Sequence, residues 1–247
     1  MHFTTWQWIL VVLGAFLIGL SKTGFAGIGV LFAVLFNYVM PAKLATGFVL
    51  PMLCFGDVVA VLVYRRHADW RALVRIFPCA AVGVAIGYFI MGRIDDQQAR
   101  RLIGGILLFM VVLHFWRRWR ETAEAPGAAP TSPWFAVMAG MFAGFATLMA
   151  NASGPVMTLY FLAMRLPKME FLGTAAVFYL LLNLFKVPFM AHLGIINASS
   201  LLVNLEMLPV VLVGTLAGKW LVQRINQKAF ETVLLTLTFL GGLKLLF

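Results

Sequence analysis

The chain has 247 residues, of which 62% are hydrophobic and 11% are charged, and its mean hydropathy is +0.96. This composition leaves too little polar surface for a soluble domain and predicts an all-α polytopic membrane protein. The net charge of +10 does not indicate nucleic-acid binding, because most Lys and Arg lie in short clusters between apolar segments, as topology signals do.

Two short apolar segments, residues 6–20 and 25–39, begin the chain. Each is shorter than the ~20 residues that a full crossing needs. They predict a broken hairpin of short helices whose bend lies at the Ser21-Lys22-Thr23-Gly24 run. A bend at mid-depth leaves backbone groups unpaired, so it has to be buried in protein or line a cavity.

Three longer apolar segments follow, at residues 44–64, 73–91 and 102–116, and are predicted to cross the membrane. A polar segment rich in Pro, Ala and charge, residues 118–133, then separates the two halves of the chain. A second break, GFATLMANASGPVMTL from Gly144 to Leu159, interrupts the next apolar region as the first break does.

The second half of the chain repeats the first. Pro41–Gly47 aligns with Pro167–Gly173 at an offset of 126, and the same offset places Asp57 on Asn183. The further matches, at offsets of 126 and then 131, are Gly14 with Gly140, Pro78 with Pro209, Gly83 with Gly214, Gly87 with Gly218 and Arg93-Ile94-Asp95 with Arg224-Ile225-Asn226. This ordered series predicts an internal duplication, typical of secondary transporters, with repeats at 1–117 and 134–247 and a cytoplasmic linker at 118–133.

Clusters of Lys and Arg indicate which loops face the cytoplasm. Four loops are basic, and they contain Arg65, Arg66 and Arg71; Arg117, Arg118 and Arg120; Arg165 and Lys168; and Arg224 and Lys228. If each hairpin returns to the side from which it entered, all four are cytoplasmic. Each half then has a hairpin and three crossings, so the repeats have inverted topology. Four basic residues fall on the outer side in this arrangement: Lys43, Arg93, Arg100 and Arg101.

Small polar residues at both breaks predict an anion site between them. Ser153 precedes Gly154-Pro155, and because proline is favoured in the first turn of a helix, a half-helix is expected to start there. Ser21 or Thr23 is expected to cap a second half-helix, so that two N-termini point unpaired N–H groups at the midplane. The substrate-binding residues predicted from the two breaks are Ser21, Thr23, Gly24, Thr147, Asn151, Ser153 and Gly154. The alternative is that they only cap helices and permit close helix packing.

Three ionisable residues lie within apolar segments. A charge at mid-membrane costs about 2.5 to 3.5 kcal/mol on the mildest scale, so Lys22 needs a partner, and a transported anion is a suitable one. Lys186 shares a helix face with Asn183, and both are predicted to bind substrate. Both lysines have the alternative of snorkelling to an interface. Three roles are open for Asp57: it neutralises Lys22 when the site is empty, it carries a proton coupled to transport, or it forms a permanent structural ion pair.

The residues also carry a family resemblance. The run GFATLMANASGPVMTLYFLAMRLPKMEFLGTAAVFYLLLNLFKVPF, residues 144–189, resembles the second-half signature of the TauE/SafE family of sulfite exporters. GLSKTGFAGIG, residues 19–29, lies where that family has its glycine-rich first motif. The resemblance implies a multi-pass transporter of the bacterial inner membrane that moves sulfite or small organosulfonates. The Ser-Lys-Thr run departs from the more glycine-rich members, which leaves the substrate open within the family.

Two other classes of function remain as alternatives. Asn151-Ala-Ser153-Gly154 superficially resembles the nucleophile motif of intramembrane serine proteases, with His192 as the candidate base, but a dyad needs hydrogen-bond reach. A cation or metal transporter needs carboxylates and imidazoles, which are scarce within the apolar segments. The sequence therefore predicts a non-enzymatic secondary transporter without metal, cofactor or nucleotide-binding motif. The anion, the direction, the coupling ion and homo-oligomer formation stay open.

Overall fold

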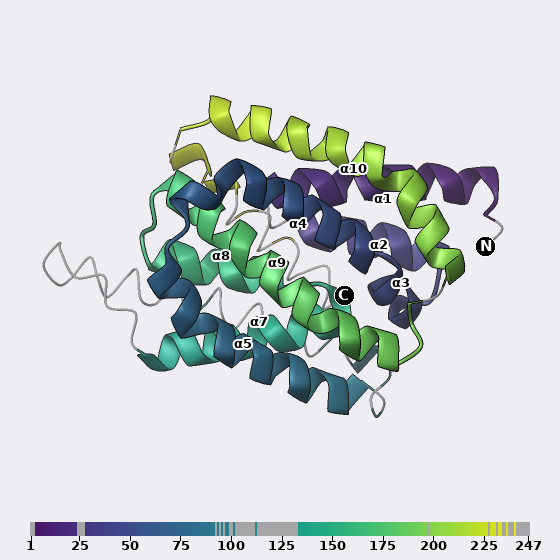
Figure 1. Ribbon diagram of the computed structural model, residues 1–247, viewed down its shortest axis with the longest axis horizontal. Coiled ribbons are helices and arrows are strands. Elements are labelled where there is room, and N and C mark those ends of the chain that lie inside the picture. Colours follow the sequence, from purple (N-terminus) through teal and green to yellow (C-terminus); the bar gives the residue numbers. More distant parts are fainter. Residues whose placement is uncertain are drawn as a thin grey trace, which may run out of the picture.

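The computed structural model describes residues 3–23, 28–91, 133–196 and 198–226, with isolated residues between 93 and 112 and between 228 and 240. The secondary structure of these parts is helical (Figure 1). The elements are α1 Thr5–Thr23, α2 Gly29–Val39, α3 Ala42–Phe48, α4 Leu50–Tyr64, a 3-10 turn Arg65–His67, α5 Trp70–Met91, α7 Pro133–Ala150, α8 Ser153–Ala163, α9 Lys168–His192 and α10 Ala198–Arg224.

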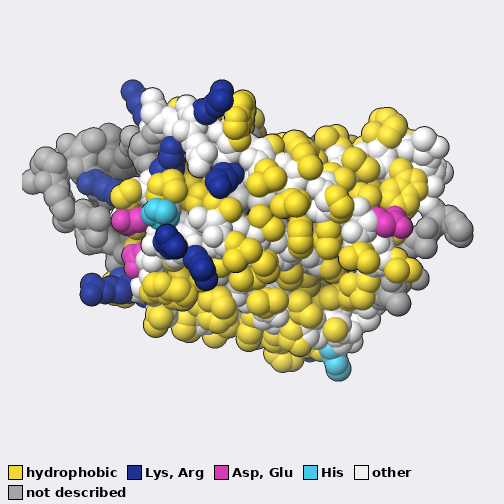
Figure 2. All heavy atoms as spheres, turned by 45° about the horizontal axis from the view of Figure 1, so that its top comes forward, with side chains coloured by type: hydrophobic (Ala, Val, Ile, Leu, Met, Phe, Trp, Pro, Cys, Tyr) yellow, Lys and Arg dark blue, Asp and Glu magenta, His cyan; other side chains and the backbone are white. Residues whose placement is uncertain are grey.

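Six helical segments within the described residues are long and apolar enough to cross a membrane. They are Thr5–Thr23, Leu44–His67, Trp70–Met91, Pro133–Ala150, Lys168–His192 and Ser200–Arg224. The prediction of an all-helical polytopic membrane protein is therefore confirmed. Figure 2 shows hydrophobic side chains over most of the visible face, with Lys and Arg gathered toward one end. The predicted crossing at 102–116 and the linker at 118–133 lie outside the described residues, apart from Val112 and from Pro133, which begins α7.

The helices are packed so that each hairpin contacts a helix from the other half of the chain. α1 packs against α2 and α10, α7 packs against α8 and α5, and α4 packs against α9. In Figure 1, α1 begins at the end marked N and α7 begins at the opposite end. Glycines allow the close contacts: a Cβ at Gly19 would collide with the carbonyl oxygen of Val211, and one at Gly144 with that of Ala80. Such small residues are what close helix packing in a membrane requires.

Three basic loops meet at one end of the bundle. Lys168 Nζ donates to the carbonyl oxygens of Val222 and Ile225, 3.1 and 2.7 Å away, and so ties the start of α9 to the end of α10. The backbone at Gly173 lies against that of His67, which follows α4. The loops with Arg65, Arg165 and Arg224 are therefore on the same side, as the charge pattern predicts.

The first hairpin differs from its prediction. Helix α1 continues through Ser21, Lys22 and Thr23, and the next four residues, 24–27, lie outside the described part. The extra turn is stabilised because its polar groups find partners: Ser21 Oγ donates to the Ile18 carbonyl oxygen at 2.7 Å, and Tyr64 donates its hydroxyl to the Thr23 carbonyl oxygen at 3.0 Å. Helix α2 starts at Gly29 without a side-chain cap. The prediction that Ser21 or Thr23 caps it is wrong.

The second hairpin follows its prediction closely. Asn151 ends α7 in the left-handed region, at φ 53°, and its N–H donates to the Thr147 carbonyl oxygen at 3.0 Å. Asparagine tolerates this conformation, which commonly terminates helices. Helix α8 begins at Ser153, with Pro155 in its first turn. Ser153 is the first helical residue rather than the cap, and the cap position before it makes no side-chain hydrogen bond.

Candidate functional site

A small pocket lies where the two hairpin ends meet α4 and α9. Its volume of about 30 Å³ has room for about two water molecules. Pockets for organic ligands measure about 300 to 1,000 Å³, so this one suits a small ion. Seven of the residues predicted to bind substrate line it: Ser21, Lys22, Thr147, Asn151, Ser153, Gly154 and Asn183. Chain segments more than 100 residues apart are thus brought together at one pocket.

Lys22 and Asp57 form a buried ion pair at this pocket. Lys22 Nζ is 2.8 Å from Asp57 Oδ1, and the two side chains are 8% and 0% exposed. The ammonium also lies over the ring of Tyr179, 5.3 Å from its centroid, where the face of the ring attracts a cation. The alternative that Lys22 snorkels to an interface is wrong, because this partner holds it inside the protein.

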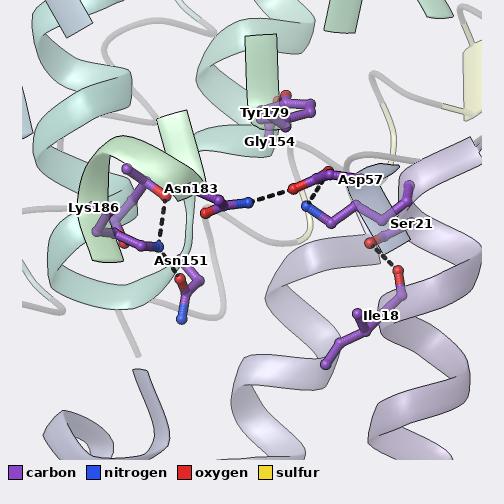
Figure 3. A network of polar contacts seen from close by, with 10 residues as sticks. Ile18, Ser21, Asp57, Asn151, Gly154, Tyr179, Asn183 and Lys186 are labelled. Carbon is purple, nitrogen blue, oxygen red and sulfur yellow. Dashed lines mark hydrogen bonds and ion pairs between the residues drawn. The ribbon is translucent and has the colours of Figure 1, made fainter. Parts of the chain in front are cut away.

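Asp57 has a second partner in Asn183. Asn183 Nδ2 donates to Asp57 Oδ2 at 2.6 Å, and both side chains are buried (Figure 3). The two residues that the repeat aligns are therefore bonded to each other, where α4 packs against α9. Each carboxylate oxygen has one partner: the Lys22 ammonium forms the ion pair with Oδ1, and the Asn183 amide donates its hydrogen bond to Oδ2. A carboxylate buried in a low-dielectric interior needs such donors to remain ionised.

Lys186 is completely buried and faces the α7–α8 turn. Its Nζ donates to the carbonyl and hydroxyl oxygens of Thr147, both at 3.3 Å, and to Asn151 Oδ1 (Figure 3). These three acceptors match the three N–H groups of an ammonium. The alternative that Lys186 snorkels outward is wrong. Helix α9 continues past Pro188, and the Lys186 side chain is 0% exposed between helices. No carboxylate within the described residues pairs with it.

Asn151 uses its side chain to fix the turn. The amide oxygen accepts from Lys186, and Nδ2 donates to the Thr46 carbonyl oxygen at 3.1 Å. The turn is thereby joined to α9 and to α3. Only one N–H of the amide is left for a ligand, so the structure gives Asn151 mainly a positioning role.

The other three residues predicted to bind substrate are Lys186, which holds the α7–α8 turn and does not line the pocket, Thr23 and Gly24. Thr23 is 0% exposed and donates its hydroxyl to the Thr215 carbonyl oxygen at 2.5 Å, so it joins α1 to α10. Gly24 lies outside the described residues.

Sequence reasoning missed several residues of the site. Tyr179, Gly29, Phe32 and Leu53 line the pocket. Tyr179 could have been found, because it lies one turn before Asn183 on the same face of α9, and its hydroxyl is 3.5 Å from the Gly154 carbonyl oxygen. Thr46 and the three apolar lining residues gave no signal, since nothing in their local sequence distinguishes them from core.

The protease alternative fails on distance. His192 ends α9, with its ring 6.2 Å from that of Tyr88. Tyr179, which reaches Gly154 next to Ser153, lies almost four turns earlier on α9, about 20 Å along the helix axis. Ser153 and His192 are therefore far outside hydrogen-bond reach. Within the described parts of the chain, no group of three or more His, Cys, Asp and Glu side chains could hold a metal ion.

Two comparisons with known proteins found similar sequences. A sequence model described as sulfite exporter TauE/SafE matches residues 10–245. A relative from Comamonas testosteroni, named "Probable inner membrane transporter protein TsaS", is 27% identical over 183 residues, which cover 73% of each chain. No solved structure matches the chain.

Proposed function

The chain belongs to the sulfite exporter TauE/SafE family, and we propose that it is a secondary transporter of a small anion, sulfite or a small organosulfonate, in the bacterial inner membrane. The family supports the substrate class, and the name of the Comamonas relative supports the membrane. The pocket between the hairpin ends is the proposed binding site, with Lys22 as the contacting cation and Ser153, Thr147 and Asn183 as neutral donors.

The observation that carries the proposal is an excess of buried positive charge. The described residues around the pocket contain two buried ammonium groups, Lys22 and Lys186, and one buried carboxylate, Asp57. An ion that is removed from water without a counter-charge costs several kcal/mol. A bound anion supplies the missing charge. A cation would meet a site that already carries a net positive charge, so nothing here favours a cation transporter.

We also propose that the two halves, residues 1–117 and 134–247, are inverted repeats that alternate access around the site, joined by a cytoplasmic linker at 118–133. Opposite entry of α1 and α7 supports inversion (Figure 1). The gathering of basic loops at one end supports its assignment as the cytoplasmic side. Binding sites at the interface of inverted repeats are typical of secondary transporters.

Matched glycine contacts support the repeat in detail. The contact of Gly19 with Val211 in α1 and α10 has its counterpart in that of Gly144 with Ala80 in α7 and α5. A second matched pair is Gly214 with Phe16 and Gly83 with Met141. In both pairs α1 maps onto α7 at an offset of 125 and α5 onto α10 at 131. The offset of 126 used to align Gly14 with Gly140 is therefore one residue too long for α1.

The proposal is tested by flux in proteoliposomes made from the full chain. Wild-type protein is expected to exchange radiolabelled sulfite or sulfoacetate across the membrane, and Lys22→Gln to reduce the rate to that of protein-free vesicles. Lys219→Gln, which changes a lysine of α10 that does not line the pocket, is the matched control and is expected to keep the wild-type rate. Wild-type vesicles that move neither anion would contradict the proposal, and movement of a metal cation would replace it.

A further inference from the structure

Asp57 holds the ammonium group that the substrate needs. Lys22 lines the pocket, whereas Asp57 lies behind it and is 0% exposed. Resting on the proposed function, we propose that Asp57 is an internal counter-anion, and that the substrate anion binds to Lys22 together with one proton that Asp57 takes up.

Repulsion between like charges is the physical reason. A substrate anion that reaches Lys22 from the pocket shares one ammonium with the Asp57 carboxylate, which is only 2.8 Å from it. Two anions so close in a water-poor site cannot both stay charged at low cost. A proton on Asp57 removes the repulsion and leaves Lys22 to the substrate. Anion binding and proton binding therefore favour each other.

Asn183 suits both protonation states of Asp57. In the observed arrangement its Nδ2 donates to the ionised carboxylate at 2.6 Å. When the amide turns by half a rotation, its oxygen faces Asp57 and accepts a hydrogen bond from the protonated acid. A lysine or arginine at this position could only donate. The partner of Asp57 is therefore one that permits a change of protonation without loss of the hydrogen bond.

Other charged and titratable groups face this pair from three helices. Helix α1 contributes Lys22, and α9 contributes Lys186, whose Nζ donates to three neutral acceptors. The phenol of Tyr179 on α9 and the thiol of Cys54 on α4 are uncharged at neutral pH. Helix α10 packs here through Val211, and its described ionisable residues Glu206, Lys219 and Arg224 lie five or more positions away along the helix. Asp57 is thus the one carboxylate among these described groups.

The test is the pH dependence of binding to the purified full chain. Methanesulfonate is the probe, because its own charge does not change between about pH 5 and about pH 8. Wild-type affinity is expected to fall about tenfold per pH unit on the alkaline side, as linkage to one proton requires. Asp57→Asn imitates the protonated acid in shape and charge. It is expected to bind at least as tightly as the wild type does at acid pH, with no dependence on pH.

A second measurement needs no variant. Wild-type protein mixed with methanesulfonate in weakly buffered solution at alkaline pH is expected to take up about one proton per bound anion. Binding that is independent of pH and takes up no proton would overturn the inference while leaving anion transport intact, as would loss of binding in a folded Asp57→Asn variant. No binding by the wild type at any pH would remove the proposed function and this inference with it.

Discussion

The two hairpin ends hold their lysines in different ways. At the end of α1, Lys22 belongs to the hairpin itself and is paired with a carboxylate from α4. At the α7–α8 turn, Lys186 comes from α9 and is held by neutral oxygens. In the proposed function the lysine at the pocket exchanges one anion for another, whereas the second lysine holds the α7–α8 turn in shape.

The two lysines do not occupy equivalent positions in the proposed repeats. The offset that aligns Asp57 with Asn183 places Lys186 opposite Ala60, and the offset of α1 places Lys22 opposite Thr147. Thr147 is itself an acceptor for Lys186. The backbone contacts of the two halves thus correspond, while the charged groups differ. The comparison shows that the close helix contacts of the two halves correspond, whereas the charged side chains at the two hairpin ends do not.

Removal of one member of the ion pair is expected to have the largest effect. Asp57→Ala leaves Lys22 buried without its counter-ion, which costs about 3 to 5 kcal/mol of stability. The double variant Lys22→Met, Asp57→Leu removes both charges and should recover most of this loss without recovering transport. Unfolding in detergent, followed by a cysteine-reactive dye, measures the stability of both variants. A double variant as unstable as Asp57→Ala would show that the loss of stability in Asp57→Ala does not come from the unpaired charge of Lys22.

Equal close packing in the two halves is tested by paired glycine variants. Gly19→Ala and Gly144→Ala each push a methyl group into a facing backbone carbonyl, and overpacking of this kind costs about 1 to 3 kcal/mol. The two losses should be similar if the halves correspond. Gly29→Ala, where a Cβ would meet Phe32 at an ordinary 3.6 Å, is the control. A large loss at one glycine and none at the other would break the proposed correspondence.

Variants of the two lysines should differ in their effects on anion binding and on stability. Lys22→Gln is expected to weaken anion binding by about tenfold to a hundredfold, because a hydrogen bond to a charged group contributes about 1.5 to 3 kcal/mol. Lys186→Gln should mainly destabilise the α7–α8 turn, by about 1 to 3 kcal/mol, since it leaves acceptors on Thr147 and Asn151 without their donor. Binding titrations and melting curves on both variants measure the difference. Identical effects on binding and melting would erase the distinction.

The smallest expected effect concerns the backbone at Asn151. Asn151→Gly and Asn151→Ala both lose the bonds to Lys186 and Thr46, but only alanine pays for a positive φ. The Asn151→Ala variant should therefore be less stable than the Asn151→Gly variant by about 1 kcal/mol. Melting temperatures of the two variants give this difference directly. Equal melting temperatures would mean that the left-handed turn relaxes once the side-chain bonds are gone.

The sequence predicted the second hairpin better than the first for a local reason. Asn151 and Pro155 act through their own backbone preferences, and such preferences can be read from neighbouring residues. The end of α1 is decided by tertiary partners instead. Tyr64, which is 41 residues away in the sequence, donates its hydroxyl to the Thr23 carbonyl oxygen. The partners of Lys186 could not be predicted for the same reason, because its acceptors lie 35 and 39 residues away in the sequence.

The bond between Asp57 and Asn183 was within reach of the sequence. The repeat aligned the two residues, and equivalent positions of two inverted repeats meet when they lie near the axis that relates them. Their spacing alone could not show that α4 packs against α9 at this point. The choice of Asp57 as the partner of Lys22 was also available from charge, since few acids lie within the apolar segments.

The central claim, that the pocket binds a small anion through Lys22, is tested most directly by the thermal stability of the purified protein. A ligand that binds the native state raises its stability by about 2.7 kcal/mol at a hundred times the dissociation constant. Sulfite or sulfoacetate is predicted to raise the melting temperature of the wild type with increasing concentration, and to raise that of Lys22→Gln much less at the same concentrations. An equal rise in the variant, or no rise in the wild type with either anion, would contradict the account.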